Sequence, residues 1–282
     1  MTEREFDDWL KLFPRRPLVM GVLNVTPDSF SDGGEFIDPG AAAAAARQMI
    51  ADGADLIDIG AESTRPGSLP VPELEQIRRL EPVFGALASE SGKMVWSIDT
   101  TRAAVAQRAF DHGVTLVNDV SAGRDDPQML PLVARRGAAV CLMHMQCTPA
   151  TMQDNPHYDD VTAEVISFLL DRVHAAKAAG VARNRIIVDP GIGFGKTDAH
   201  NLELLRRLSD LTTIGQPTLV GTSRKGFIGR ITGEPEAALR QFGTAATVSW
   251  CIANGADIVR VHDVKPMRQV MEMTQAIRHW RE

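Results

Sequence analysis

Residues 53–59 read GADLIDI, and a similar stretch, GADIVRV, returns at residues 255–261. A looser copy, GVTLVND, lies at residues 113–119. Each copy opens on a glycine, which suits the point where a helix ends and the chain turns into a strand, because a positive φ is favoured there. One explanation of the repeat is that all helix-to-strand turns look alike. Either way, the copies favour one helix–strand unit used repeatedly along the chain.

Short apolar runs alternate with longer segments whose apolar residues recur every three or four positions, the period of an amphipathic helix. The runs are residues 18–25, 56–61, 95–99, 116–120, 138–145, 186–189, 218–221 and 257–261, and helical spacing is clear over 73–88, 103–110, 161–179 and 236–253. Nearly continuous apolar strands, each followed by a helix, indicate a parallel sheet buried on both faces. Eight such units predict an α/β fold with a single (β/α)8 TIM barrel.

The length of the chain agrees with one barrel. It has 282 residues, of which 44% are hydrophobic and 23% charged, and these average values exclude general disorder and a disulfide scaffold. We expect residues 18–282 to form the barrel domain and residues 1–17 to form an extension that caps it. A doubly wound open sheet is the alternative fold, and it would need a topological switch in the strand order.

Charge and cysteine content limit the binding partners and the cellular compartment that we expect for the protein. The net charge of −6 leaves no basic field to hold a nucleic acid. The three cysteines, Cys141, Cys147 and Cys251, form neither a C-x-x-C motif nor a metal-ligand set, which indicates a reducing compartment. The acidic start of the chain does not resemble a signal peptide, and no run of about 18 apolar residues is present. We therefore expect a soluble, cytoplasmic protein without membrane or nucleic-acid partners.

Polar residues gather at the ends of the predicted strands, where the active sites of such barrels lie. Asp99, Asn118 and Asp189 come from three strands and would face a common axis. Carboxylates and an amide in this arrangement suit a flat heterocycle bearing amino and ring N–H groups. The alternative is that they are helix caps or internal ion pairs. Asp58, inside an apolar run, is expected to be a buried partner for a cation such as Arg260.

A second polar set is cationic and predicts an anion site. It consists of Arg65, Lys225, Arg260 and His262. Arg260 and His262 are two positions apart on one strand, so their side chains share a face. In an acidic protein, cations at strand ends indicate an anionic substrate group, most simply a phosphate. For Arg65, a surface salt bridge is the alternative.

Residues 193–197, GFGKT, resemble the end of a phosphate-binding P-loop. That motif needs a glycine five residues before Gly195, where this chain has Pro190. Asp189 would also place a carboxylate beside the phosphate. We therefore interpret the glycines as a permissive turn beneath a planar ligand, with Phe194 as an exposed apolar wall.

Taken together, the strand-end motifs resemble those of the dihydropteroate synthase family, from about residue 18 to the end of the chain. Five blocks carry the resemblance, in order and each at a predicted strand end. They are GVLNVTPDSFSDGG at residues 21–34, GAESTRPG at 60–67, DPGIGFGKT at 189–197, SRKGFIG at 223–229 and RVHDV at 260–264.

The resemblance implies a folate-biosynthesis transferase that condenses 6-hydroxymethyl-7,8-dihydropterin diphosphate with p-aminobenzoate to give 7,8-dihydropteroate and pyrophosphate. It also implies dependence on Mg²⁺, a homodimer and inhibition by sulfonamides. It places Asp99, Asn118, Asp189, Lys225 and Met143 at the pterin, Asn24, Arg65, Arg260 and His262 at the diphosphate, and Phe30, Thr64, Pro66, Phe194, Lys225 and Ser223 at p-aminobenzoate. Asn24 would act through Mg²⁺.

The residues suit an SN1-like reaction, with Asp99, Lys225 and Arg260 as catalytic residues. Pyrophosphate leaves readily once Mg²⁺ and cations neutralise its charge. The pterin ring can delocalise the cation left on its methylene, and Asp99 would stabilise it. The aniline nitrogen is neutral near pH 7, so no strong general base is needed, and the protein supplies position and electrostatics.

Two other functions share some of these features. A pterin-binding methyltransferase barrel would share the heterocycle set but would lack the STRPG and SRKG motifs, which are intact at residues 63–67 and 223–226. A non-catalytic pterin-binding paralogue would have no reason to retain both loops. Release of pyrophosphate by the pure protein distinguishes the synthase from both.

Overall fold

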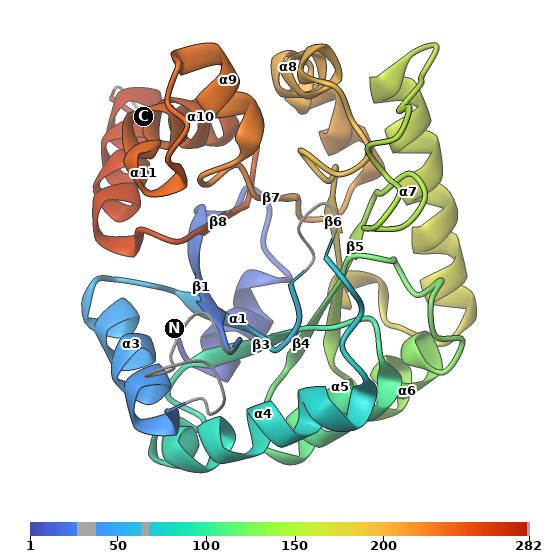
Figure 1. Cartoon of the computed structure of the whole chain (residues 1–282), viewed down its shortest axis with the longest axis vertical. Helices are drawn as coiled ribbons and strands as arrows, with labels where there is room; N and C mark the ends of the chain where they lie inside the picture. Colours follow the sequence, from blue (N-terminus) through green and yellow to red (C-terminus); the bar gives the residue numbers. More distant parts are fainter. Residues whose placement is uncertain (27–37, 64–67, 281–282) are drawn as a thin grey trace.

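Eight parallel strands form the centre of the protein (Figure 1), in a computed structural model that describes residues 1–26, 38–63 and 68–280. The strands are β1 (Leu18–Asn24), β2 (Leu56–Gly60), β3 (Val95–Asp99), β4 (Leu116–Asp119), β5 (Ala139–Met143), β6 (Ile186–Asp189), β7 (Leu219–Val220) and β8 (Ile258–Val261). They are ordered β6-β5-β4-β3-β2-β1-β8-β7. A parallel bridge between Val188 and Thr218 joins the two ends of this order. The sheet is therefore a closed (β/α)8 barrel, and the open doubly wound alternative is excluded.

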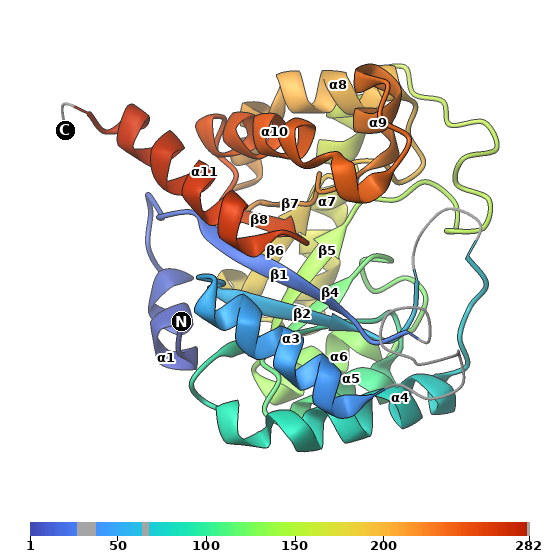
Figure 2. The same ribbon diagram turned by 60° about the vertical axis from the view of Figure 1, so that its left-hand side comes forward.

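Helices surround the barrel, as the two views in Figures 1 and 2 show. They are α1 (Glu3–Trp9), α3 (Pro39–Ala51), α4 (Glu73–Leu87), α5 (Ala103–Asp111), α6 (Met129–Arg136), α7 (Val161–Ala178), α8 (Asp198–Arg206), α9 (Gly226–Thr232), α10 (Gln241–Ala253) and α11 (Val264–Arg278), with short 3-10 turns η1 (Ala88–Glu90), η2 (Arg183–Arg185), η3 (Leu208–Ile214) and η4 (Ala237–Leu239). Within the described residues, no helix is both long and apolar enough to cross a bilayer.

Several of the predicted elements are shorter than the sequence indicates, among them the strand at 218–221 and the helix at 236–253. The run at 218–221 contributes only Leu219 and Val220 to β7. The helical segment expected over 236–253 is divided at Arg240 into η4 and α10. The guanidinium of Arg240 donates to the carbonyls of Glu234 and Arg224, so it bonds outside the helix just where α10 begins.

The repeated glycine turns are confirmed. Gly53 and Gly255 follow helices and have φ of +96° and +97°, a region that a side chain rarely tolerates. Both precede a buried strand, and the apolar faces of the helices pack on the outside of these strands. The main core therefore lies between the sheet and its helices.

The N-terminal segment lies against the end of the barrel where the strands begin. Phe6, Trp9 and Leu10 are buried together with the first inward residues of the strands, including Leu18 and Leu56. The indole of Trp9 also donates to the carbonyl of Arg16 at 2.8 Å. This end of the barrel interior is apolar, which leaves the opposite, C-terminal end for polar groups.

Candidate active site

A cavity of roughly 1020 Å³ lies at the C-terminal end of the strands. Ten of the predicted site residues line it: Asn24, Asp99, Asn118, Met143, Asp189, Phe194, Ser223, Lys225, Arg260 and His262. Phe30, Thr64, Arg65 and Pro66 lie outside the described residues. The structure thus brings together polar side chains from widely separated parts of the chain.

The two-residue period of a β-strand explains why these side chains point inward. Leu116 packs in the apolar end of the barrel interior, and Asn118 lies two positions further along the same strand. Ile258 and Arg260 are related in the same way on β8. Alternate residues of a strand face the same side, so an inward apolar residue predicts an inward polar residue at the next even position.

Arg260 is the centre of an ion-pair network inside the barrel. Its Nε donates to Oδ2 of Asp58 at 2.7 Å, and a terminal nitrogen donates to Oδ2 of Asp99 at 2.8 Å. Asn118 Nδ2 also donates to Oδ2 of Asp58, at 2.9 Å. The expected role of Asp58 as a buried partner of Arg260 is confirmed. The residues predicted to bind a heterocycle and those predicted to bind an anion therefore belong to one network, because both groups project from the inner face of the barrel.

Two carboxyl groups of the site have raised pKa values. Burial raises the pKa of Asp99 to about 7 against the opposing charge of Arg260, and nearby Asp58 adds to the rise. Burial raises the pKa of Asp189 to about 6, although the N–H of Gly191 donates to its Oδ1 at 2.7 Å. Among the described residues, no group donates to the buried Oδ1 of Asp99 or of Asp58. Buried acceptors of this kind suit a ligand that brings hydrogen-bond donors.

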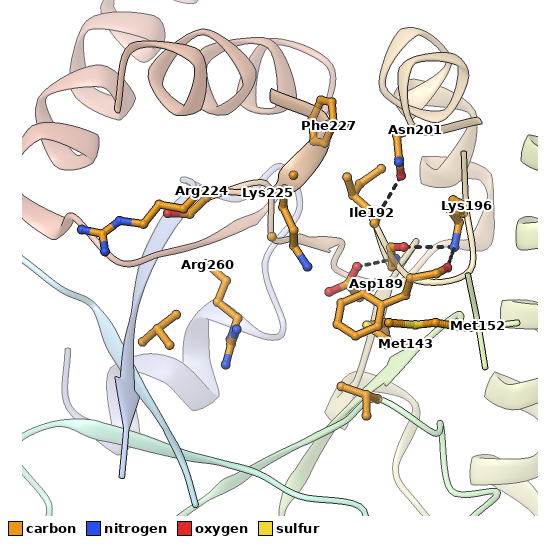
Figure 3. Close-up of a pocket in the computed structure, with 18 of the residues that line it drawn as sticks. Met143, Met152, Asp189, Ile192, Lys196, Asn201, Arg224, Lys225, Phe227 and Arg260 are labelled. Carbon is orange, nitrogen blue, oxygen red and sulfur yellow. Dashed lines mark hydrogen bonds between the residues drawn. The ribbon is translucent and has the colours of Figure 1, made fainter. Parts of the chain in front are cut away.

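Side chains from the segments that follow β6, β7 and β8 form the other wall of the cavity (Figure 3). Nδ1 of His262 lies 3.0 Å from Oγ of Ser223, and the backbone N–H of His262 donates to the same oxygen. Nζ of Lys225 lies 4.1 Å from the centre of the Phe194 ring, a cation–π contact. A cation and an aromatic face therefore meet beside Asp189, where an aromatic carboxylate could be bound.

The glycines at 191, 193 and 195 form a tight turn and not a phosphate loop. A Cβ on Gly191 would lie 1.9 Å from the carbonyl oxygen of His144, so only glycine fits there. The expected exposure of Phe194 is wrong in one respect. Its ring is half-buried, because it packs against a small apolar cluster that includes Met143 and Met152.

Sequence reasoning missed the role of Lys196. The sequence assigns this residue no role beyond its place in the GFGKT stretch, and lysine side chains are mostly exposed in proteins. Its side chain is buried, and Nζ bonds to groups of the loop itself. No local pattern signals this, since the acceptors become available only when the loop is folded against β5.

The chain matches the family model described as "Pterin binding enzyme" over residues 20–262. A dihydropteroate synthase of Synechocystis is 46% identical over 274 residues, which are 97% of this chain and 92% of that protein. A Yersinia pestis dihydropteroate synthase solved in a sulfonamide complex superposes with a TM-score of 0.88 at 43% identity, covering 94% of this chain and 95% of that one. A Xanthomonas albilineans dihydropteroate synthase with 4-aminobenzoic acid superposes with a TM-score of 0.87 at 43% identity, covering 93% of each chain.

Proposed function

This chain belongs to the dihydropteroate synthase family of pterin-binding enzymes, and on that premise we propose that its cavity condenses 6-hydroxymethyl-7,8-dihydropterin diphosphate with p-aminobenzoate. The products are 7,8-dihydropteroate and pyrophosphate. The observation that carries the proposal is the group of buried acceptors, above all Oδ1 of Asp99, to which no described residue donates. A pterin offers amino and ring N–H donors that match such acceptors.

Asp99, Asn118 and Asp189 bind the pterin, and Met143 packs against its ring. Asp189 lines the cavity, and the N–H of Gly191 donates to its Oδ1. This bond fixes the carboxylate at the cavity wall, where it can accept from the pterin. A charge-assisted hydrogen bond in a buried site contributes more than one in water, so the ligand is oriented as well as held.

The diphosphate lies towards Arg260, His262 and Asn24, with Arg65 as a further expected contact outside the described residues. Mg²⁺ suits this end of the cavity, because Asn24 lines it and would offer an amide oxygen, and Mg²⁺ is usually held by few protein oxygens together with substrate phosphates. Within the described residues there is no cluster of three His, Cys, Asp or Glu side chains, so the substrate would complete the ligand set. When bound, the ion would neutralise part of the leaving-group charge.

The reaction is SN1-like. The bond between the pterin methylene and the diphosphate oxygen breaks first, and pyrophosphate takes the electron pair. Arg260 stabilises the leaving anion, while the carboxylate of Asp99 stabilises the positive charge left on the ring. The nitrogen of p-aminobenzoate then forms the new C–N bond and loses a proton to water.

The p-aminobenzoate site is framed by Phe194, Lys225 and Ser223. Lys225 supplies a positive charge for the carboxylate, and Phe194 supplies a flat apolar surface for the ring. Phe30, Thr64 and Pro66, which lie outside the described residues, are proposed to complete this site. A sulfonamide shares the aniline ring and would compete for the same place.

A second copy of the chain is proposed to cover part of the helical surface. Large exposed apolar side chains occur on α8, α9 and α10, among them Leu202, Ile231 and Phe242. Exposed apolar groups on neighbouring helices are typical of a protein–protein interface. Analytical ultracentrifugation tests the homodimer, and localisation in the cytoplasm remains a prediction.

The decisive test mixes pure protein, Mg²⁺, the pterin diphosphate and p-aminobenzoate, and measures pyrophosphate. We expect release of one pyrophosphate for each dihydropteroate formed, and only when both substrates are present. Binding of the pterin without turnover would favour the non-catalytic paralogue. Methyl transfer from methyltetrahydrofolate without pyrophosphate release would favour the methyltransferase.

A further inference from the structure

The buried amino group of Lys196 is held within the loop that follows β6. The residue is only 2% exposed. Its Nζ donates to the carbonyls of Gly191 and Phe194, both at 3.0 Å, and lies 2.9 Å from Nδ1 of His144. Burial lowers the pKa of Lys196 to about 7, against the opposing charge of Asp189. When protonated, Nζ has three N–H donors, and these three acceptors satisfy them. A buried charge is tolerated only with such partners, which makes this bonding geometry specific.

His144 supplies the acceptor from the neighbouring strand end. It follows β5, and its ring packs edge-on against Phe168 at a centroid distance of 4.9 Å. Burial and the charge of Lys196 lower the pKa of His144 to about 2. The imidazole is therefore neutral, and Nδ1 can accept from Lys196. Lys196 thus ties the loop after β6 to the end of β5.

The tied loop forms one wall of the active site (Figure 3). Lys196 bonds the carbonyl of Phe194, whose ring contacts Lys225. On the cavity side, the methylene groups of Lys225 pack against Gly193, where an added Cβ would lie 3.3 Å from Cδ. The loop backbone therefore lies between two lysines, one on the substrate side and one on the buried side.

The two halves of the site depend on this loop to different degrees. Asp189 is the last residue of β6, so the barrel itself positions it. Phe194 lies five residues beyond the strand, and its place depends on the loop. Loss of the Lys196 bonds should therefore move the aromatic wall more than the pterin carboxylate.

We propose that Lys196 is a positioning residue that, together with His144, holds Phe194 in place against Lys225 and so sets the affinity for p-aminobenzoate. This inference rests on the proposed function. Lys196 lies behind the wall and acts through the backbone carbonyls of Gly191 and Phe194, so it is not a catalytic residue.

The test is steady-state kinetics of Lys196→Met, which keeps the length and apolar stem of the side chain but removes the donors. We expect KM for p-aminobenzoate to rise by about tenfold or more, while KM for the pterin diphosphate and kcat stay within about threefold of the wild type. Arg172→Met is the matched control. Arg172 is a partly buried cation on α7, and its Nε donates to the carbonyl of Ala122 at 2.9 Å. Its replacement should leave both KM values unchanged.

His144 provides a second, independent pair of variants if Lys196→Met does not fold. His144→Leu removes the acceptor and should raise KM for p-aminobenzoate as Lys196→Met does. His144→Asn keeps an acceptor near the position of Nδ1 and should restore most of the affinity. An unchanged KM in Lys196→Met, an equal rise in both KM values, or equal behaviour of the two His144 variants would overturn the inference. Inactivity of the wild-type protein would instead refute the proposed function, and this inference with it.

Discussion

Replacement of Asp58 by asparagine tests the ion-pair network at the centre of the barrel. Asp58 is fully buried, and its Oδ2 accepts from both Arg260 and Asn118. Asparagine keeps the size of the side chain and one acceptor oxygen but removes the negative charge. Two separate effects follow, one on the stability of the protein and one on the ionisation of Asp99.

The first effect is a loss of stability. A hydrogen bond to a charged group contributes about 1.5–3 kcal/mol and a neutral one about 0.5–1.5 kcal/mol, so weakening the bond to Arg260 costs about 1 kcal/mol. The larger cost of leaving a buried charge unpaired, about 3–5 kcal/mol, does not apply, because Asp99 still pairs with Arg260 at 2.8 Å. We expect Tm to fall by about 2–4 °C.

The second effect is on the ionisation of Asp99. The charge of Asp58 is one cause of the raised Asp99 pKa of about 7, so its removal lowers that pKa. A protonated Asp99 has one acceptor fewer for the pterin. In the wild type, pterin affinity should therefore weaken as the pH falls through about 7, and in Asp58→Asn this weakening should begin at a lower pH.

The assay is a calorimetric titration with a non-reactive pterin across this pH range, together with thermal unfolding. Asp210→Asn is the control, since it removes a surface carboxylate on η3 that pairs with Arg207. It should shift neither the pH dependence of pterin binding nor, by more than about 1 °C, the Tm. If pterin affinity in Asp58→Asn begins to weaken at the same pH as in the wild type, or at a higher pH, the assigned coupling between the two carboxyl groups is refuted.

Four other variants test separate parts of the structure. Asp189→Asn should weaken pterin binding by about 1.5–3 kcal/mol in calorimetry while the circular dichroism spectrum is unchanged; wild-type affinity would remove Asp189 from the pterin site. His262→Ala should weaken binding of Mg²⁺-pyrophosphate by about tenfold, and an unchanged Kd would exclude the contact. Phe6→Ala should lower the free energy of unfolding in urea by about 3–5 kcal/mol with kcat retained, because Phe6 is fully buried at the end of the barrel away from the site. Gly191→Ala should lower both Tm and activity, since its Cβ would collide with the carbonyl of His144; a wild-type Tm would show that the turn can rearrange.

The strands and the inward direction of the site residues could be predicted from local sequence. An apolar run of the right length indicates a buried strand wherever it lies, and strand alternation then places Asn118, Asp189 and Arg260 on one side. The pairing of Arg260 with Asp58 was also within reach, because a lone aspartate in an apolar strand requires a buried cation. The other contacts of the site depend on distances across the barrel, which the periodicity of the local sequence does not reveal.

Local sequence is enough to establish the repeated strand–helix unit, the side of each strand that carries polar groups, and the motifs of a dihydropteroate synthase. These features depend on residues close together in the chain, whose periods follow from backbone geometry. The tertiary structure is needed to show that Val188 meets Thr218 to close the barrel, and that Arg260 also pairs with Asp99, 161 residues away. The burial of Lys196 and the raised pKa of Asp99 also depend on the tertiary structure. The ionisation and bonding of a buried charge depend on which groups surround it and how much water is excluded, and those conditions exist only once the barrel is closed.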